Sequence, residues 1–215
     1  MSPLSRAGAA CLLVGPLAGI ASVLIERSVS LQAADLAAAY TAHPAATHLG
    51  LAVNAVASVL TAAGLIWFAW STYPRSPRLA VAGGVLGVLG MFSVMVDDAV
   101  HLAGSLVTGG MTTAQATPLL DRLTSGGVMA AGILSELADL GVILLALAAL
   151  RIGVPRWGSA ALCIGTIAQG AGFASGSRYL AVAGFAVAFV GFATVVRTAF
   201  DRVPAVSLPL DVQRV

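Results

Sequence analysis

Six long apolar stretches, separated by polar segments, organise the chain. A helix needs about 20 apolar residues to cross the hydrocarbon core of a bilayer. The stretches reach about that length and therefore predict an all-α fold, a polytopic membrane protein built as a bundle of six transmembrane helices. The predicted helices cover about 7–26, 48–72, 79–107, 127–150, 157–175 and 179–199. They form one domain, 1–202, and residues 203–215 are expected to be a cytoplasmic C-terminal tail.

The distribution of arginine predicts how these helices are oriented. If the N terminus is inside, eight of the eleven basic residues, all of them arginine, lie on the cytoplasmic side. The positive-inside rule then favours an N-in, C-in topology. The two longer connections, before residue 48 and after residue 107, would be outside. Leu119, Leu120 and Leu123 share one helical face in the second, so each connection could hold a short helix on the outer surface.

Composition supports a membrane location and excludes several functions. The chain is 59% hydrophobic and 9% charged, with a mean hydropathy of +0.96, whereas soluble domains contain about 25% charged residues. The lipid bilayer is therefore the first expected partner. The absence of lysine excludes Schiff-base chemistry, and the scattered arginines exclude nucleic acid as a partner. The Ala-, Val- and Arg-rich composition favours a bacterial plasma membrane, while homo-oligomerisation stays open.

Ionisable residues inside two predicted helices mark the candidate site. Asp97, Asp98 and His101 lie in VMVDDAVHLAG, and Glu136 and Asp139 lie in ILSELADLGVI. A charged side chain near the bilayer centre costs at least about 2.5 kcal/mol. These residues are therefore expected to face one another or a hydrated cavity rather than lipid.

Helical periodicity predicts which polar side chains converge. Residues three, four and seven apart share a helix face, which places Asp97 with His101 and Glu136 with Asp139. Asn54 and Gln169 lie on polar stripes of two further helices, at a similar expected depth. We therefore expect a pocket in the outer half of the bundle. Asp98 is about 100° around the helix from Asp97, so one of the two should instead bond a neighbouring helix or reach the outer loop.

Three functional classes fit such a pocket. The first is a proton-coupled permease for a small molecule or ion, in which Asp97, His101 and Glu136 relay protons and Asn54, Asp98, Asp139 and Gln169 contact the substrate. The second is a membrane-embedded enzyme that uses the same acids in acid–base catalysis on a lipid or isoprenoid substrate. The third is a non-catalytic accessory or sensor protein. No cofactor is predicted, although His101, Asp97 and Glu136 could hold a divalent metal.

Parts of the chain resemble a known group of proteins. The segments are the opening helix LLVGPLAGIASVL, the extended connection that follows it, and VPRWGSAALCIG from Val154 to Gly165. They are similar to a widespread, uncharacterised group of small six-helix bacterial integral membrane proteins. The resemblance implies the six-helix fold, and no function or catalytic residue follows from it.

Overall fold

The described chain is helical throughout. The computed structural model describes residues 2–26, 32–125 and 127–201, without the side chains of 127–131, and this part contains no strand. The predicted tail, 203–215, lies outside the described residues. The helices are α1 (Pro3–Ile25), α2 (Ala33–Ala42), α3 (Pro44–Thr72), α4 (Pro77–Val107), α5 (Thr113–Thr124), α6 (Gly127–Arg151), α7 (Arg156–Ala174) and α8 (Arg178–Asp201).

The six long helices match the six predicted segments to within a few residues. Proline is the first residue of α1, α3 and α4, where its missing N–H costs no helical hydrogen bond. Within the described ranges, five helical segments are long and apolar enough to cross a membrane, in α1, α3, α4, α6 and α8. These apolar helices indicate a multi-pass membrane protein. The shorter α7, with 19 residues, is not among the five.

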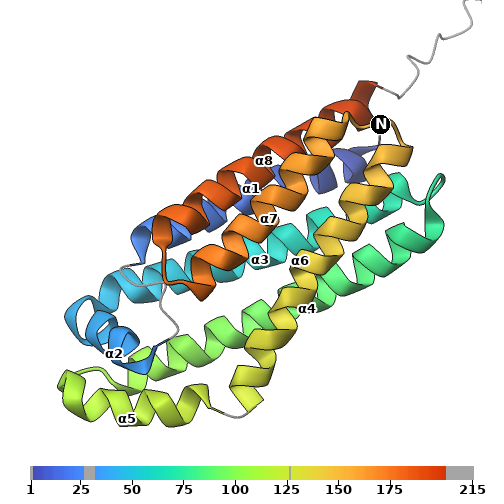
Figure 1. Ribbon diagram of the computed structural model, residues 1–215. Coiled ribbons are helices and arrows are strands. Elements are labelled where there is room, and N and C mark those ends of the chain that lie inside the picture. Colours follow the sequence, from blue (N-terminus) through green and yellow to red (C-terminus); the bar gives the residue numbers. More distant parts are fainter. Residues whose placement is uncertain (1, 27–31, 126, 202–215) are drawn as a thin grey trace, which may run out of the picture.

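The six long helices lie side by side in an elongated bundle (Figure 1). Each packs against two principal neighbours, in the order α1, α3, α4, α6, α7, α8 and back to α1. The N terminus is at one end, which we call the terminal end. The short helices α2 and α5 are at the other, which we call the cap end.

Glycine brings some of these helices into direct backbone contact. A Cβ built at Gly141 of α6 would collide with the backbone of Gly87 on α4. A Cβ at Gly165 of α7 would likewise collide with the backbone of Ala188 on α8. Small residues at helix crossings permit this approach, and close van der Waals packing drives helix association in membranes.

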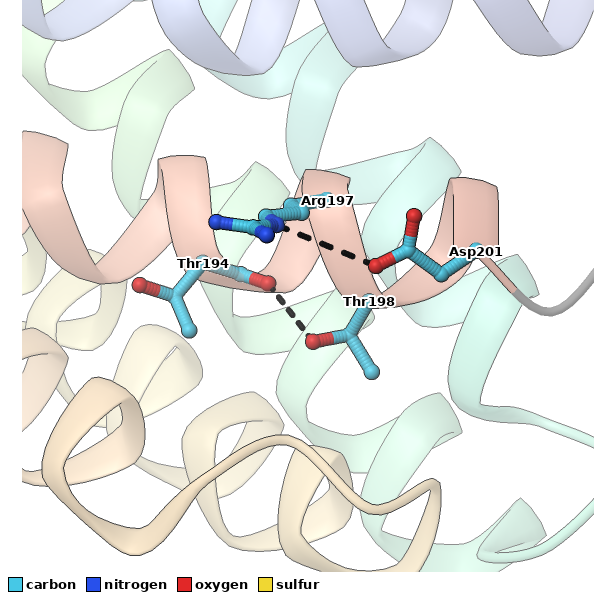
Figure 2. A network of polar contacts seen from close by, with 4 residues as sticks. All are labelled: Thr194, Arg197, Thr198 and Asp201. Atoms are coloured by element: carbon cyan, nitrogen blue, oxygen red, sulfur yellow. Dashed lines mark hydrogen bonds and ion pairs between the residues drawn. The ribbon is translucent and has the colours of Figure 1, made fainter.

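The apolar core lies toward the terminal end. Leu12, Leu65, Phe68, Leu145 and Leu162 have no exposed surface. At the same end the last turns of α8 carry polar contacts (Figure 2). There the Thr198 hydroxyl donates to the Thr194 carbonyl at 2.8 Å, and Arg197 Nε lies 3.8 Å from Asp201 Oδ2. Both members of this ion pair are largely exposed, so the pair contributes little stability.

The two short helices pack against each other at the cap end and form what we call the cap. Leu36, Ala37 and Tyr40 of α2 pack with Ala116 and Leu120 of α5 in a separate apolar cluster. The hydroxyls of Thr41 and Thr113 are 3.2 Å apart and join the same two helices. The short helices expected in the two longer connections are therefore confirmed.

Candidate functional site

A pair of hydrogen bonds between two long helices joins Asn54 of α3 to Asp98 of α4. The amide nitrogen of Asn54 donates to both carboxylate oxygens of Asp98, at 2.9 and 3.0 Å. Asp98 is only 7% exposed. It is thus the member of the Asp97–Asp98 pair that bonds a neighbouring helix, as expected for one of the two. A buried carboxylate needs such a partner, because desolvation strongly disfavours an unpaired charge.

Glu26 lies beside this contact, at the C-terminal cap of α1. A Cβ built at Gly50 of α3 would be 2.7 Å from Glu26 Cγ, and the Ser22 hydroxyl donates to the Gly50 carbonyl at 3.0 Å. Gly50 and Asn54 are one helical turn apart on one face of α3, so Glu26 and Asp98 are neighbours along that face. Burial, followed by the charge of Asp98, raises the pKa of Glu26 from 4.5 to about 8.

Tyr40 of the cap closes over the same region. Its ring meets the His101 ring edge-on, with centroids 6.5 Å apart and planes at 66°. Tyr40 is only 3% exposed, and its hydroxyl has no hydrogen-bond partner in the described part of the chain. Burial raises the pKa of Tyr40, and the charges of Glu26, Asp97 and Asp98 raise it further. The hydroxyl is therefore within electrostatic reach of all three carboxylates.

Together these residues form what we call the cap-side cluster. It takes its members from four helices or helix ends, and Asp97 and His101, both half-buried, complete it. Its residues are Glu26, Tyr40, Asn54, Asp97, Asp98 and His101. Among the described residues, no arginine lies within ion-pair distance of its carboxylates. Such a group can take up protons or a cation, because like charges in a poorly solvated site repel one another.

The two remaining predicted acids lie elsewhere, on α6 against α7. A Cβ at Gly170 would be 2.9 Å from Asp139 Oδ2 and 3.8 Å from Glu136 Oε2. Asp139 is half-buried, whereas Glu136 is exposed. Both carboxylates therefore approach the same turn of α7, which lacks a side chain at the nearest position.

Gln169 belongs to a third environment. The backbone of Gln169 packs against Gly184 of α8, and Gly165 and Gly172 of the same stripe also pack against α8. The stripe that was expected to line the pocket thus forms the α7–α8 contact along its length.

The structure therefore brings some of the predicted site residues together. It pairs Asn54 with Asp98, and Glu136 with Asp139. No hydrogen bond or ion pair between described residues links Asp97 or His101 to Glu136, so their approach stays a prediction. No three His, Cys, Asp or Glu side chains within the described ranges come together in a way that could hold a metal ion. The metal option thus gains no support.

Sequence reasoning missed two members of the cap-side cluster. Glu26 directly follows the first apolar helix and was assigned to a helix end, and Tyr40 was assigned to a connection. The signal for Glu26 was its expected depth, because it ends the first long helix at about the depth where the next long helix carries Asn54. Tyr40 gave no comparable signal, since its contact with His101 depends on the tertiary position of α2.

Comparisons with protein-family models, with curated proteins and with solved structures find no match for this chain. The class of the protein, a multi-pass membrane protein with a polar cluster beneath a two-helix cap, therefore rests on its own residues.

Proposed function

We propose that the protein is a six-span integral membrane protein of a bacterial plasma membrane that works as a proton-coupled permease for a small molecule or ion. A sixth span requires α7 to cross the membrane. Its 19 residues give about 28 Å at about 1.5 Å per residue, close to the thickness of about 30 Å of a hydrocarbon core. The position of α7 between α6 and α8 in the bundle also supports this count.

The proposed orientation is N-in and C-in. The terminal end carries most of the arginines in the described part of the chain, whereas Arg122 and Arg178 are at the cap end. The arginines of the terminal end are Arg6, Arg75, Arg78, Arg151, Arg156 and Arg197. This asymmetry supports a cytoplasmic terminal end, which would turn the cap-side cluster toward the outside.

The observation that carries the permease proposal is the Asp98–Asn54 contact within a group of three carboxyls. Asp98 has the neutral amide of Asn54 as its side-chain partner. Among the described residues, no arginine forms an ion pair with Glu26, Asp97 or Asp98. Buried acids with little compensation exchange protons readily with a bound cation or polar ligand. Such chains of acids and histidine are typical of proton relays in transporters.

Proton movement in proteoliposomes tests this function. Purified protein would be reconstituted with a pH-sensitive dye inside the vesicles, and candidate substrates would be added outside. We expect a substrate-dependent pH change that is lost in Asp98→Asn. The control is Asp121→Asn, which also replaces an aspartate with asparagine, but at an exposed position on α5. This variant should leave the pH change intact. A substrate-dependent signal of equal size in Asp98→Asn and wild type would refute the role of the cluster.

The membrane-enzyme alternative is favoured by a different observation. Glu136 is exposed on α6 among exposed apolar side chains, with Ile133 65% exposed and Leu140 45% exposed. A carboxylate reached from the lipid side suits acid–base chemistry on a lipidic substrate. Turnover of labelled lipids or isoprenoids that is lost in Glu136→Gln but kept in Asp98→Asn would support this function over the permease. If neither variant changes any activity, the accessory or sensor role takes precedence.

A further inference from the structure

We propose that the cap-side cluster binds a small primary ammonium ion, with Glu26 and Asp98 as counter-charges and the Tyr40 hydroxyl as an additional hydrogen-bond acceptor. This inference rests on the proposed function and names the substrate class of the same site. Three features of the cluster support it: an unsatisfied hydroxyl, two carboxyls placed one turn apart along α3, and apolar surroundings supplied by the cap.

The unsatisfied hydroxyl belongs to Tyr40. The residue is 3% exposed, and its oxygen has no hydrogen-bond partner among the described residues. Buried hydroxyls almost always have a partner, so an orphan of this kind indicates that a ligand supplies it. The hydroxyl can accept a hydrogen bond from an N–H group, and three carboxyls lie within electrostatic reach of it.

The spacing of the carboxyls suits one ammonium group. Glu26 lies against Gly50, and Asp98 is bonded by Asn54, one turn along the same face of α3. From this register we infer that the two carboxyls are roughly one turn apart, about 5.4 Å. A nitrogen between two oxygens, each at about 2.8 Å as in charge-assisted hydrogen bonds, would span about this distance. An ammonium group carries three N–H donors, which matches two carboxylates and one hydroxyl.

An organic cation fits better than a metal ion for two reasons. The described residues contain no three acidic, histidine or cysteine side chains grouped closely enough to hold a metal. The surroundings of Tyr40 are also apolar, because it packs with Leu36 of α2 and Leu120 of α5. A short alkyl chain on the nitrogen would contact these side chains, whereas a bare hydrated ion would gain nothing from them.

The charge balance of binding follows from the chemistry of Glu26. Below about pH 8 this carboxyl is largely protonated in the empty site. When R–NH3⁺ enters, the carboxyl O–H bond breaks, the proton leaves to solution, and the carboxylate becomes the counter-ion of the ammonium group. One cation then replaces one proton, so the net charge of the site is unchanged, as an ammonium–proton exchanger requires.

Calorimetry on the purified full chain in detergent tests the ligand class. Ethylammonium chloride is the probe, and tetramethylammonium, Na⁺ and Mg²⁺ chlorides are the comparison ions. We expect ethylammonium to bind at least about tenfold more tightly than each of the others and to release protons into a weakly buffered dye solution near pH 7. Glu26→Gln should weaken binding at least tenfold and abolish the proton release.

Tyr40→Phe keeps the ring, removes the hydroxyl, and should weaken binding about three- to tenfold, as expected for one hydrogen bond. Its matched control is Tyr179→Phe, since Tyr179 is 81% exposed, and Asp121→Asn is the control for Glu26→Gln. Thermal unfolding followed by tryptophan fluorescence checks that each variant is folded. If a cluster variant fails to fold, competition by ethylammonium against the other ions on wild type decides the ligand class.

Two results would overturn the inference. One is the absence of ethylammonium binding to folded wild type, and the other is binding of Na⁺ or Mg²⁺ as tight as that of ethylammonium. In either case an Asp98-dependent pH change with another substrate in proteoliposomes would still support the permease. The two proposals therefore fail separately.

Discussion

Replacing Glu26 with glutamine should remove the contribution of this carboxyl to the pH dependence of stability between pH 4.5 and 7. The pKa of Glu26 is raised from 4.5 to about 8 by burial and by the charge of Asp98. Between these values the folded chain holds a proton that the unfolded chain has lost. The contribution of Glu26 to the free energy of unfolding is therefore greatest below pH 4.5. It falls as the pH rises from 4.5 to about 8.

The magnitude follows from the size of this window. At about 1.36 kcal/mol per pH unit, the loss between pH 4.5 and pH 7 is about 3 kcal/mol for this group. Glu26→Gln mimics the protonated acid, so at pH 7 it should be more stable than wild type by up to about that amount. The variant's own stability should change less with pH.

Intrinsic fluorescence can measure the difference. Wild type and Glu26→Gln would be unfolded by SDS in mixed micelles at half-unit steps from pH 4.5 to 8.5, and Trp67, Trp70 and Trp157 would report the transition. Asp121→Asn controls for loss of an exposed acid. Asp98 and Tyr40 interact electrostatically with Glu26, and Asp97 acts on the same Tyr40. All three groups remain in both proteins, so their own titration contributes to both curves. Parallel curves, or a wild type that gains stability across this window, would refute the reasoning.

Three further predictions concern the bundle itself. Asn54→Leu removes the amide that bonds a buried carboxylate and should cost about 1.5–3 kcal/mol of stability at pH 8, measured in the same SDS assay. Gly141→Leu should separate α4 from α6 at Gly87 and cost at least the 1–3 kcal/mol typical of overpacking; an unchanged melting temperature would contradict the close approach. Single cysteines at Arg75 and Gly110 should react with a membrane-impermeant thiol reagent on opposite sides in intact cells, the first only after permeabilisation, and the reverse result would overturn the N-in orientation.

The long helices could be predicted from sequence because the length of an apolar run is a local property. The helix ends followed equally local signals, such as proline at the start of α3 and α4. The short helix α5 was indicated by its leucine stripe, and its capping box of Thr112 and Gln115 reinforces it. What these signals leave out is which neighbour each helix face meets.

The candidate site illustrates that limit. Helical geometry showed that Asp97 and Asp98 point in different directions, but the α3–α4 packing decides that Asp98 meets Asn54. Gln169 was predicted to line the pocket, but the glycines around it fit closely against any neighbouring helix, and the backbone of Gln169 meets Gly184 of α8. Tyr40 enters the cluster through the docking of α2, which no periodicity within residues 33–42 predicts.

The position of the polar residues follows from how tightly the helices pack along the bundle. Toward the terminal end, Gly87 and Gly141 let α4 and α6 touch through their backbones, and the apolar core fills the space around them. Beyond this seam on α6, Gly132 has no atom within 4 Å of a built Cβ, and Glu136 is exposed. The half of the bundle at the terminal end should resist rearrangement, because a closely packed interior has little free space into which a helix could move. For the ligand proposed for the cap-side cluster, we therefore expect entry by movement of the cap over His101, with the terminal half as a rigid base.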